Sequence, residues 1–463
     1  MDNSRNKKIV LFITSLGSFL TPFMSSSINI ILPLIGKEFA IDVVLVSWIA
    51  VSYLLATAIF LVPFGKIADI KGRKKIFSYG IIIYTLSSFL VTLSRSIFML
   101  IFLRILQGIG SAMIFATAIA ILTSAFPAKE RGKVLGINAA VVYSGLSLGP
   151  FLGGFLAEKF NWRSLFFLNA FLGLLTIIFI FWKLKDEGSE EKKENFDFVG
   201  SFIYSLAILM IIYGFSLAPE RLGLFLVFLG ILGIAAFAKW EAKIKNPVLD
   251  INLFKNNKTF AFSNLAALIN YSTTFAVGFL LSLYLQYLKG LNPQTTGLIL
   301  LAQPLVMIIF SPLAGKISDQ IEPRIIASLG MFCAALGLFF FIFLTEKTKL
   351  NFIIINLILM GLGNSFFASP NTNAIMNSVE NKFYGIASGM IGTMRLIGQM
   401  LSMAIAMLIF TISMGKTQIA PENYLLFLEG TKKIFFIFTL LCLVGIFVSF
   451  YRTKNINSIK KTI

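Results

Sequence analysis

The chain has 463 residues and a net charge of +19, and 57% of its residues are hydrophobic, among them 49 phenylalanines. A soluble core of this length could not bury so much apolar surface, so the composition predicts a polytopic membrane protein and argues against a nucleic-acid binder despite the positive charge. The sequence has no histidine, and Cys333 and Cys442 lie in apolar runs, which excludes a disulfide framework and a His/Cys metal cluster.

Fourteen apolar runs are each long enough to cross about 30 Å of hydrocarbon as a helix. We place them at residues 9–35, 45–65, 76–94, 97–123, 134–157, 164–183, 198–218, 222–240, 259–288, 294–315, 324–344, 351–373, 384–413 and 433–452. The first run is too long for a signal-peptide core and lacks a small-residue cleavage site, so we expect it to be a retained span.

An even number of spans puts both termini on one side of the membrane, and the basic residues indicate which side. Of the forty Lys and Arg residues, twenty-seven fall on the side of the termini, eleven fall on the other side, and Arg104 and Arg395 lie within spans. The positive-inside rule therefore predicts that both termini are cytoplasmic.

A short internal repeat divides the chain into halves. Residues 65–69 read GKIAD after the second span, and residues 315–319 read GKISD after the tenth, 250 residues later. Six spans with short loops take roughly 190 residues, so about 60 residues are inserted between the halves. The sequence thus predicts a six-helix bundle in residues 1–190, two inserted helices in 191–250 and a second six-helix bundle in 251–463. Such repeats place a substrate site between the halves near the middle of the bilayer.

Motifs along the first half resemble those of a known family. Residues 65–75 read GKIADIKGRKK, residues 104–110 read RILQGIG, residues 145–154 read GLSLGPFLGG and residues 161–163 read NWR. They resemble motifs of the major facilitator superfamily, and in particular of its fourteen-helix group of drug:proton antiporters. The positions that match the fifth-helix motif of the efflux branch are Gly136, Gly145, Gly149, Pro150, Gly153 and Gly154.

The resemblance implies the major facilitator fold, an all-α polytopic membrane protein of two six-helix bundles plus two extra central helices. It implies a secondary-active multidrug efflux transporter of a prokaryotic cell membrane, which exports small amphipathic molecules by alternating access and is not an enzyme. It also implies a monomer in the lipid bilayer that is driven by an ion gradient, in this group protons, and uses no cofactor, metal or nucleic acid.

In the loop of residues 65–75, the resemblance assigns a conformational latch to Gly65, Asp69, Gly72, Arg73 and Lys74. Asp69 can accept from backbone N–H groups at a nearby helix N-terminus, and Gly315 and Asp319 repeat the pattern in the second half. Ile70 stands where the family usually has Arg or Lys, so we expect Lys71 or Arg73 to take that role. The alternative is that the basic residues only set the topology.

The fifth predicted span is rich in glycine for a helix. At about 100° per residue, Gly145, Gly149 and Gly153 form one stripe, while Gly136 and Gly154 share the opposite side. Bare stripes let neighbouring helices approach closely, and Pro150 is expected to bend the helix. Ordinary small-residue packing explains one stripe; two favour a helix that seals against its partner in one state and slides in another.

A charged side chain inside the membrane is costly unless it faces protein or water. For Arg104 we weigh control of a proton or of an anionic substrate against a structural role bound to backbone carbonyls, and the resemblance favours the first. Arg395 is equally deep in the thirteenth span. Both interpretations stay open for it.

Acidic residues are absent from the predicted span cores: of the 21 Asp and Glu, fourteen lie on the side of the termini and seven on the other. Met24 stands where the resemblance leads us to expect an Asp. Proton coupling normally uses a buried carboxylate or His, which leaves Asp69, Glu158 and Asp42 as candidates. Because lipophilic cations are bound by aromatic faces plus a carboxylate, a neutral or anionic amphipathic substrate is the better electrostatic match than an organic cation.

Polar side chains on helices one, four, nine and twelve are candidates for substrate binding, because the equivalent helices line the cavity in the family that the chain resembles. They are Asn29, Gln107, Asn270, Tyr271, Thr274 and Asn364. The alternative for each is an interhelical hydrogen bond worth about 0.6 kcal/mol. Residues 369–373 (SPNTN) are expected to unwind the end of the twelfth span and gate the site.

Other functions compete with drug efflux. Among transporters the alternative is a lipid or lipid-precursor flippase, or an exporter of one specific neutral or anionic metabolite without a buried-carboxylate proton site. Uptake is less favoured by the fifth-helix motif. A membrane enzyme would need a catalytic acid, a His or a metal cluster at the membrane, and the sequence does not offer one.

Overall fold

The computed structural model describes residues 2–126, 128–183, 196–217, 220–244, 247, 254–255, 257–379, 384–415 and 417–451. Within these ranges every regular element is a helix, and fourteen segments are long and apolar enough to span a membrane. The predicted all-α fold with fourteen spans is confirmed.

The helices of the first half are α1 (Asp2–Glu38), α2 (Val43–Lys71), α3 (Arg73–Thr92), α4 (Ile97–Ala125), α5 (Ala128–Lys159) and α6 (Arg163–Lys183). Helices α7 (Phe198–Leu217) and α8 (Arg221–Glu241) follow. The second half contains α10 (Lys258–Thr274), α11 (Val277–Leu283), the π-helix η1 (Tyr284–Leu288), α12 (Pro293–Leu300), α13 (Ala302–Gln320), α14 (Pro323–Phe341), α15 (Leu350–Asn377), α16 (Tyr384–Met414), the short helix η3 (Pro421–Asn423) and α17 (Tyr424–Phe450).

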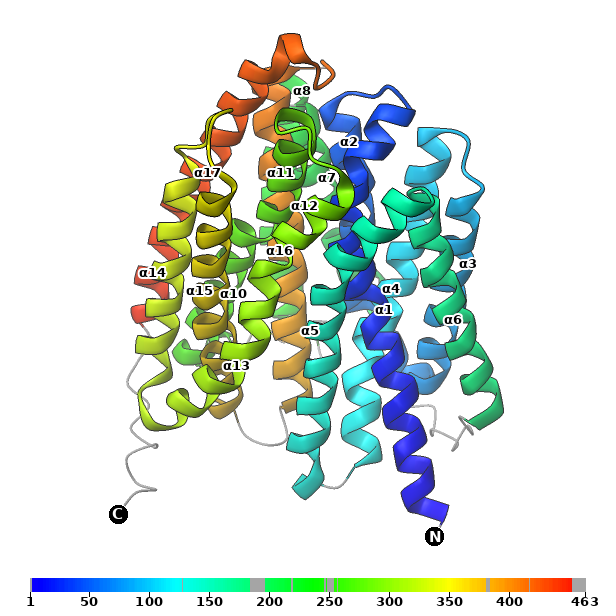
Figure 1. Ribbon diagram of the computed structural model, residues 1–463. Coiled ribbons are helices and arrows are strands. Elements are labelled where there is room, and N and C mark those ends of the chain that lie inside the picture. The colour runs from blue at the N-terminus through cyan, green and yellow to red at the C-terminus, as the bar shows by residue number, and fades with distance from the viewer. Residues whose placement is uncertain are drawn as a thin grey trace.

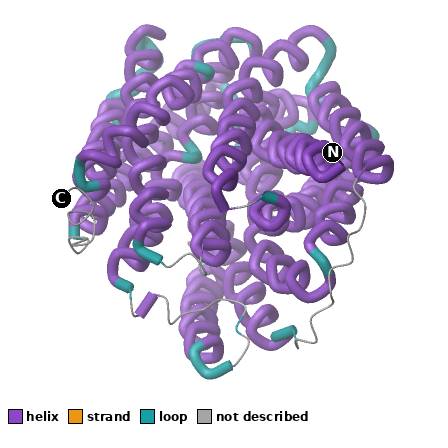
Figure 2. The backbone as a smooth tube through the Cα atoms, turned by 90° about the horizontal axis from the view of Figure 1, so that it is seen from below, coloured by secondary structure: helices purple, strands orange, loops and turns teal. Residues whose placement is uncertain are grey.

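The helices stand side by side, and the start of α1 and the end of α17 lie at the lower end in Figure 1. We call this the terminal end and the opposite one the far end; Figure 2 looks at the terminal end. In the first half α1 packs on α5 and α2 on α4, while in the second α14 packs on α15 and α10 on α16. Helices α7 and α8 pack on each other, and α7 also contacts α2 and α16, so the inserted pair touches both halves.

The ninth span covers Lys258–Leu288, as predicted for residues 259–288, but its helix is interrupted in the middle. Helix α10 ends at Thr274 and α11 begins at Val277. At the break Ala276 N–H donates to Ser402 Oγ of α16 (3.0 Å), and the hydroxyls of Thr273 and Thr274 donate to the carbonyl of Asn270 (2.9 Å each). Side chains thus satisfy backbone groups where the regular ladder stops, which makes a break tolerable inside a membrane.

One expectation is wrong. Residues 369–373 do not unwind, because α15 continues through Pro370 to Asn377. Its polar side chains are held by neighbours, with Asn371 Nδ2 donating to the Ser263 carbonyl (3.2 Å). The last span, predicted at residues 433–452, is confirmed within Pro421–Phe450, and its helix α17 begins already at Tyr424. The prediction excluded the charged residues near 429–433, but Glu and Lys are good helix formers and extend the helix.

Candidate functional site

Among the described residues, three hydrogen bonds join the two halves at the far end. Gln286 Nε2 donates to the Ile30 carbonyl (2.8 Å), and the Tyr287 hydroxyl donates to the Pro33 carbonyl (3.1 Å). Gln418 Nε2 donates to the Ala40 carbonyl (2.5 Å). Each acceptor is a main-chain group in the last turns of α1 or just beyond it, and each donor is an uncharged side chain of the second half. The end of α1 is therefore held against the second half by neutral contacts.

Helix α5 packs on α1 through its first glycine stripe. A Cβ added to Gly145 would lie 2.9 Å from the carbonyl oxygen of Phe19, and one added to Gly153 would lie 3.2 Å from Ser27 Cβ. Ser27 Oγ also donates to the carbonyl of Gly149 (2.9 Å). This face of α5 holds the first half together, and larger residues would push α1 away.

The opposite side of α5 packs against helix α12 of the second half. A Cβ added to Gly154 would lie under 3.0 Å from the Pro293 carbonyl at the start of α12. One added to Gly297 of α12 would lie under 3.0 Å from the Pro150 carbonyl of α5. The two helices therefore meet backbone to backbone, one glycine from each side. Gly136, predicted for the same side, lies in α5, but its surroundings fall outside the described residues.

Three glycines near the terminal end have open space beside them. A Cβ added to Gly65 of α2, or to Gly389 or Gly392 of α16, would meet no other atom within 4 Å. The helix faces that carry these three glycines are therefore not packed against a described neighbour at these points. The structure is closed at the far end, and elsewhere the halves also contact each other, α2 with α16 and α5 with α13.

A cavity lies between the halves at the middle of the helices. Its polar lining consists of Thr21, Ser25, Tyr53, Tyr143, Asn270, Tyr271, Thr274, Asn364, Arg395 and Gln399. Its volume of about 80 Å³ holds only a few water molecules, so binding of a drug-sized molecule requires the halves to move apart. Four of the six predicted substrate-binding residues line it, namely Asn270, Tyr271, Thr274 and Asn364.

Arg395 is the one charged side chain among the described residues that line this cavity. Its guanidinium lies over the ring of Phe115 of α4, 5.7 Å from the ring centroid. Within the described part of the chain it makes no ion pair. A half-buried, uncompensated cation gives the cavity a positive potential, which favours electron-rich or anionic ligands and opposes cations.

Arg104 does not reach the cavity and is fully buried in the first half. Its Nε donates to the Ile49 carbonyl (3.1 Å), its Nη1 donates to Gln107 Oε1 (2.5 Å), and its guanidinium stacks over Tyr53, 4.2 Å from the ring centroid. Gln107 Nε2 in turn donates to Ser88 Oγ (2.7 Å). The geometry matches the structural interpretation of both Arg104 and Gln107, because these contacts tie α4 to α2 and α3.

Asn29 also lies outside the cavity lining. It is buried on α1, and its Nδ2 would lie 3.4 Å from a Cβ added to Gly278 of α11. It therefore belongs to the contact between α1 and α11 rather than to the cavity.

Where α2 ends and α3 begins, Arg73 is the basic residue that pairs with Asp69. Arg73 Nη2 lies 2.7 Å from Asp69 Oδ1, and Nη1 of the same side chain donates to the Ala120 carbonyl of α4 (3.4 Å). Gly72 has a φ of 100°, which favours glycine. In the second half, an added Cβ on Gly315 would lie 2.9 Å from Ser369 Oγ. The side chain of Asp319 falls outside the described residues.

Two carboxylates that the sequence placed in loops are buried. Asp197 is 9% exposed and Glu241 2% exposed, and both lie at the terminal end of the α7–α8 pair. Asp197 accepts from the backbone N–H of Gly200 (2.9 Å) and from Trp240 Nε1 (3.1 Å). Glu158, by contrast, is exposed at the far end. Hydropathy alone could not find the buried acids, because packing of α7 on α8 buries them.

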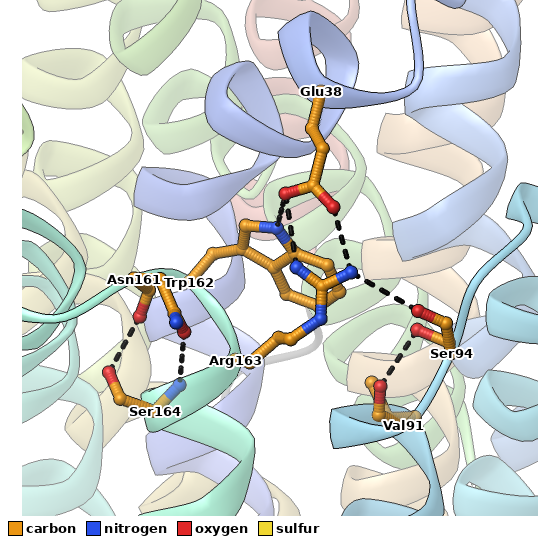
Figure 3. A network of polar contacts seen from close by, with 7 residues as sticks. All are labelled: Glu38, Val91, Ser94, Asn161, Trp162, Arg163 and Ser164. Atoms are coloured by element: carbon orange, nitrogen blue, oxygen red, sulfur yellow. Dashed lines mark hydrogen bonds and ion pairs between the residues drawn. The ribbon is translucent and has the colours of Figure 1, made fainter.

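A polar cluster fixes the far end of the first half (Figure 3). Glu38 accepts from Trp162 Nε1 (2.6 Å) and from Arg163 Nη2 (2.7 Å), and Arg163 Nη2 also donates to the Ser94 carbonyl (3.1 Å). The Arg163 guanidinium stacks on Trp162, 4.2 Å from the ring centroid. The cluster joins α1, the α3–α4 loop and α6. It therefore positions the end of α1 that contacts the second half.

We expect Glu38→Gln to lower the free energy of unfolding by about 1 kcal/mol, because the half-exposed ion pair is bidentate and shares its carboxylate with an indole N–H. Glu422→Gln is the matched control, since Glu422 is an exposed acid at the same end. Unfolding of the purified protein in detergent measures the difference. Equal stability of the two variants would show that the cluster does not position α1.

Two helical bundles that enclose a cavity and meet at one end define a polytopic membrane transporter. The chain belongs to the Major Facilitator Superfamily, whose sequence profile matches residues 14–249 and 264–462. It is 30% identical over 459 residues to the riboflavin transporter RibZ of Clostridioides difficile, covering 98% of this chain and all of that protein. It is 29% identical over 409 residues to the multidrug resistance protein Stp of Mycobacterium tuberculosis, covering 87% of this chain and 75% of that protein.

The fold is also that of solved transporters. A bacterial homolog of the human lysosomal transporter Spinster, in an inward-facing and unoccupied conformation, matches with a TM-score of 0.66 and 17% identity, covering 96% of each chain. The chain is thus a multi-pass membrane transporter and not an enzyme.

Proposed function

We propose that the protein exports amphipathic, neutral or anionic small molecules across a bacterial cell membrane by alternating access, with both termini in the cytoplasm. The observation that carries the proposal is the central cavity with Arg395, placed between halves that are joined by hydrogen bonds at the far end. This arrangement corresponds to a carrier closed at the far end, whose halves move apart on the terminal side before a drug-sized molecule enters. The two-sided glycine packing of α5 and the similarity to Stp support export.

Accumulation of a compound panel in cells that express the protein, compared with an inactive variant, tests this proposal. The panel contains riboflavin, fluorescein as an anionic dye and ethidium as a cationic dye. We expect lower retention of the neutral and anionic compounds and little change for ethidium. Equal retention of every compound would contradict export.

A second candidate is transport of riboflavin as the specific substrate. It is favoured by the similarity to RibZ along the whole chain and by the tyrosine and amide side chains around the cavity, which suit an uncharged aromatic molecule with polar edges. Competition separates the two candidates: a multidrug carrier loses riboflavin transport to unrelated dyes, whereas a riboflavin-specific one does not.

Proton coupling is a separate part of the proposal. In proteoliposomes we expect an imposed pH gradient to drive uphill transport, because the relevant group of the superfamily couples to protons. Asp69→Asn and Glu158→Gln should each be compared with Asp197→Asn, which removes a buried carboxylate of the inserted helices. The coupling residue is the one whose loss abolishes the drive but preserves downhill exchange. Transport that ignores the gradient in the unmodified protein would contradict proton coupling.

A further inference from the structure

Two buried amide groups in the cavity lack partners. Asn270 is 1% exposed and its Nδ2 donates to no described group, while Asn364 is 8% exposed and its Oδ1 accepts from none. Both side chains line the cavity, from α10 and α15. Buried polar groups are nearly always hydrogen-bonded, so a pair left open toward a cavity points to a ligand that completes them.

The neighbouring hydroxyls do not complete this pair. Thr274 Oγ1 and Thr273 Oγ1 donate to the backbone carbonyl of Asn270 at the break before α11. The break holds the end of α10 in place, so the amide of Asn270 is presented to the cavity from a fixed backbone. Each amide carries a donor group and an acceptor atom, and no described group pairs with Nδ2 of Asn270 or with Oδ1 of Asn364. Together the two side chains can therefore offer a donor and an acceptor to a ligand in the cavity.

A ligand that pairs with both amides must supply an acceptor and a donor, as a C=O group next to an N–H group does. This is the edge of a lactam or an imide, as found on planar heteroaromatic rings. The cavity supplies surfaces for such a ring, because Tyr53, Tyr143 and Tyr271 line it. Arg395 adds a fork of donors with no acid beside it in the described lining, which suits a carbonyl-rich or acidic group.

We propose, on the basis of the proposed transport function, that this cavity selects planar heteroaromatic molecules with a lactam or imide edge. Asn364 accepts the ring N–H, Asn270 donates to the adjoining carbonyl, and Arg395 binds a hydrogen-bond acceptor elsewhere on the molecule, either a carbonyl or an acid. Organic cations of the same size are rejected, because Arg395 repels them and no carboxylate of the described lining compensates.

A matched pair of probes tests the imide edge. Riboflavin carries an imide N–H, and 3-methylriboflavin has that hydrogen replaced by a methyl group. Fluorescence quenching measures the binding of each to the purified full-length protein in lipid nanodiscs. We expect the methylated probe to bind the unmodified protein about tenfold more weakly, as loss of a hydrogen bond to a buried amide predicts.

Variants assign the contact to the asparagines. We expect Asn364→Ala and Asn270→Ala each to weaken riboflavin binding about tenfold, and Asn364→Ala to abolish the difference between the two probes. Asn377→Ala is the matched control, since Asn377 lies on the same helix α15 but is exposed at the terminal end. Its binding should equal that of the unmodified protein, and gel filtration verifies that each variant is folded.

Flavin mononucleotide, which carries a phosphate that riboflavin lacks, tests whether Arg395 binds an acidic group or a carbonyl. A larger loss of affinity for the mononucleotide than for riboflavin in Arg395→Gln identifies an acid, and an equal loss identifies a ring carbonyl.

Equal binding of riboflavin and 3-methylriboflavin, or unaltered binding in both asparagine variants, would overturn the inference. If dyes of the panel are still transported in that case, the transport proposal stands. If no compound is transported, both fail.

Discussion

We expect Gly297→Ala to reduce transport at least about tenfold while the protein stays folded. Its added Cβ would lie under 3.0 Å from the Pro150 carbonyl, a backbone atom that cannot turn away. Overpacking of this kind costs about 1–3 kcal/mol. Because the contact joins the two halves, the cost falls on the state closed at the far end. Each 1.4 kcal/mol lowers the population of that state about tenfold relative to the open one.

Gly278→Ala is the matched control on the same interface. Its Cβ would lie 3.4 Å from Asn29 Nδ2 of α1, an ordinary van der Waals contact. We expect near-normal transport from this variant. The rate of substrate movement into proteoliposomes measures both. Equal transport by the two variants would show that close packing of α5 on α12 is not needed for the cycle.

Arg104→Lys is expected to lower the free energy of unfolding by about 3 kcal/mol. Lysine keeps the buried charge, but its single ammonium cannot reach the Ile49 carbonyl and Gln107 together while stacking on Tyr53. Loss of transport should then follow the loss of folded protein and be equal for every substrate.

Arg395→Lys provides the comparison, because it is the same substitution at the other intramembrane arginine. Arg395 faces the cavity, so we expect a change in stability below about 0.5 kcal/mol and a change in substrate preference instead. Unfolding in detergent and transport of the dye panel measure the two effects. Altered substrate preference with normal stability in Arg104→Lys would place Arg104 in the substrate pathway.

The sequence was sufficient for the number of spans, because an apolar run of about 20 residues has few alternatives to a membrane helix. It could not reveal the break at Phe275 and Ala276, where no glycine or proline marks the site and Ser402 of a distant helix supplies the partner. That break depends on tertiary contact.

In the site, too, the sequence predicts which residues lie in the spans but not which of them tertiary packing brings to the cavity. Arg104 and Arg395 look alike in sequence, since each is a lone cation in an apolar span, yet one is enclosed by Ile49, Gln107 and Tyr53 and the other lines the cavity. Which face of a helix meets the cavity is decided by packing against neighbours far along the chain. The resemblance placed four of the cavity residues on the right helices, but it could not separate them from Asn29 and Gln107.

The most direct test of alternating access is a reversible cross-link across the far end. Ala40 and Gln418 belong to different halves, are exposed and are joined by a hydrogen bond. A short thiol-specific cross-linker between Ala40→Cys and Gln418→Cys, with Cys333 and Cys442 replaced by serine, fixes the closed end. We predict that transport stops on cross-linking and returns on reduction, while neither single-cysteine variant is affected by the reagent. Undiminished transport by fully cross-linked protein would contradict the account.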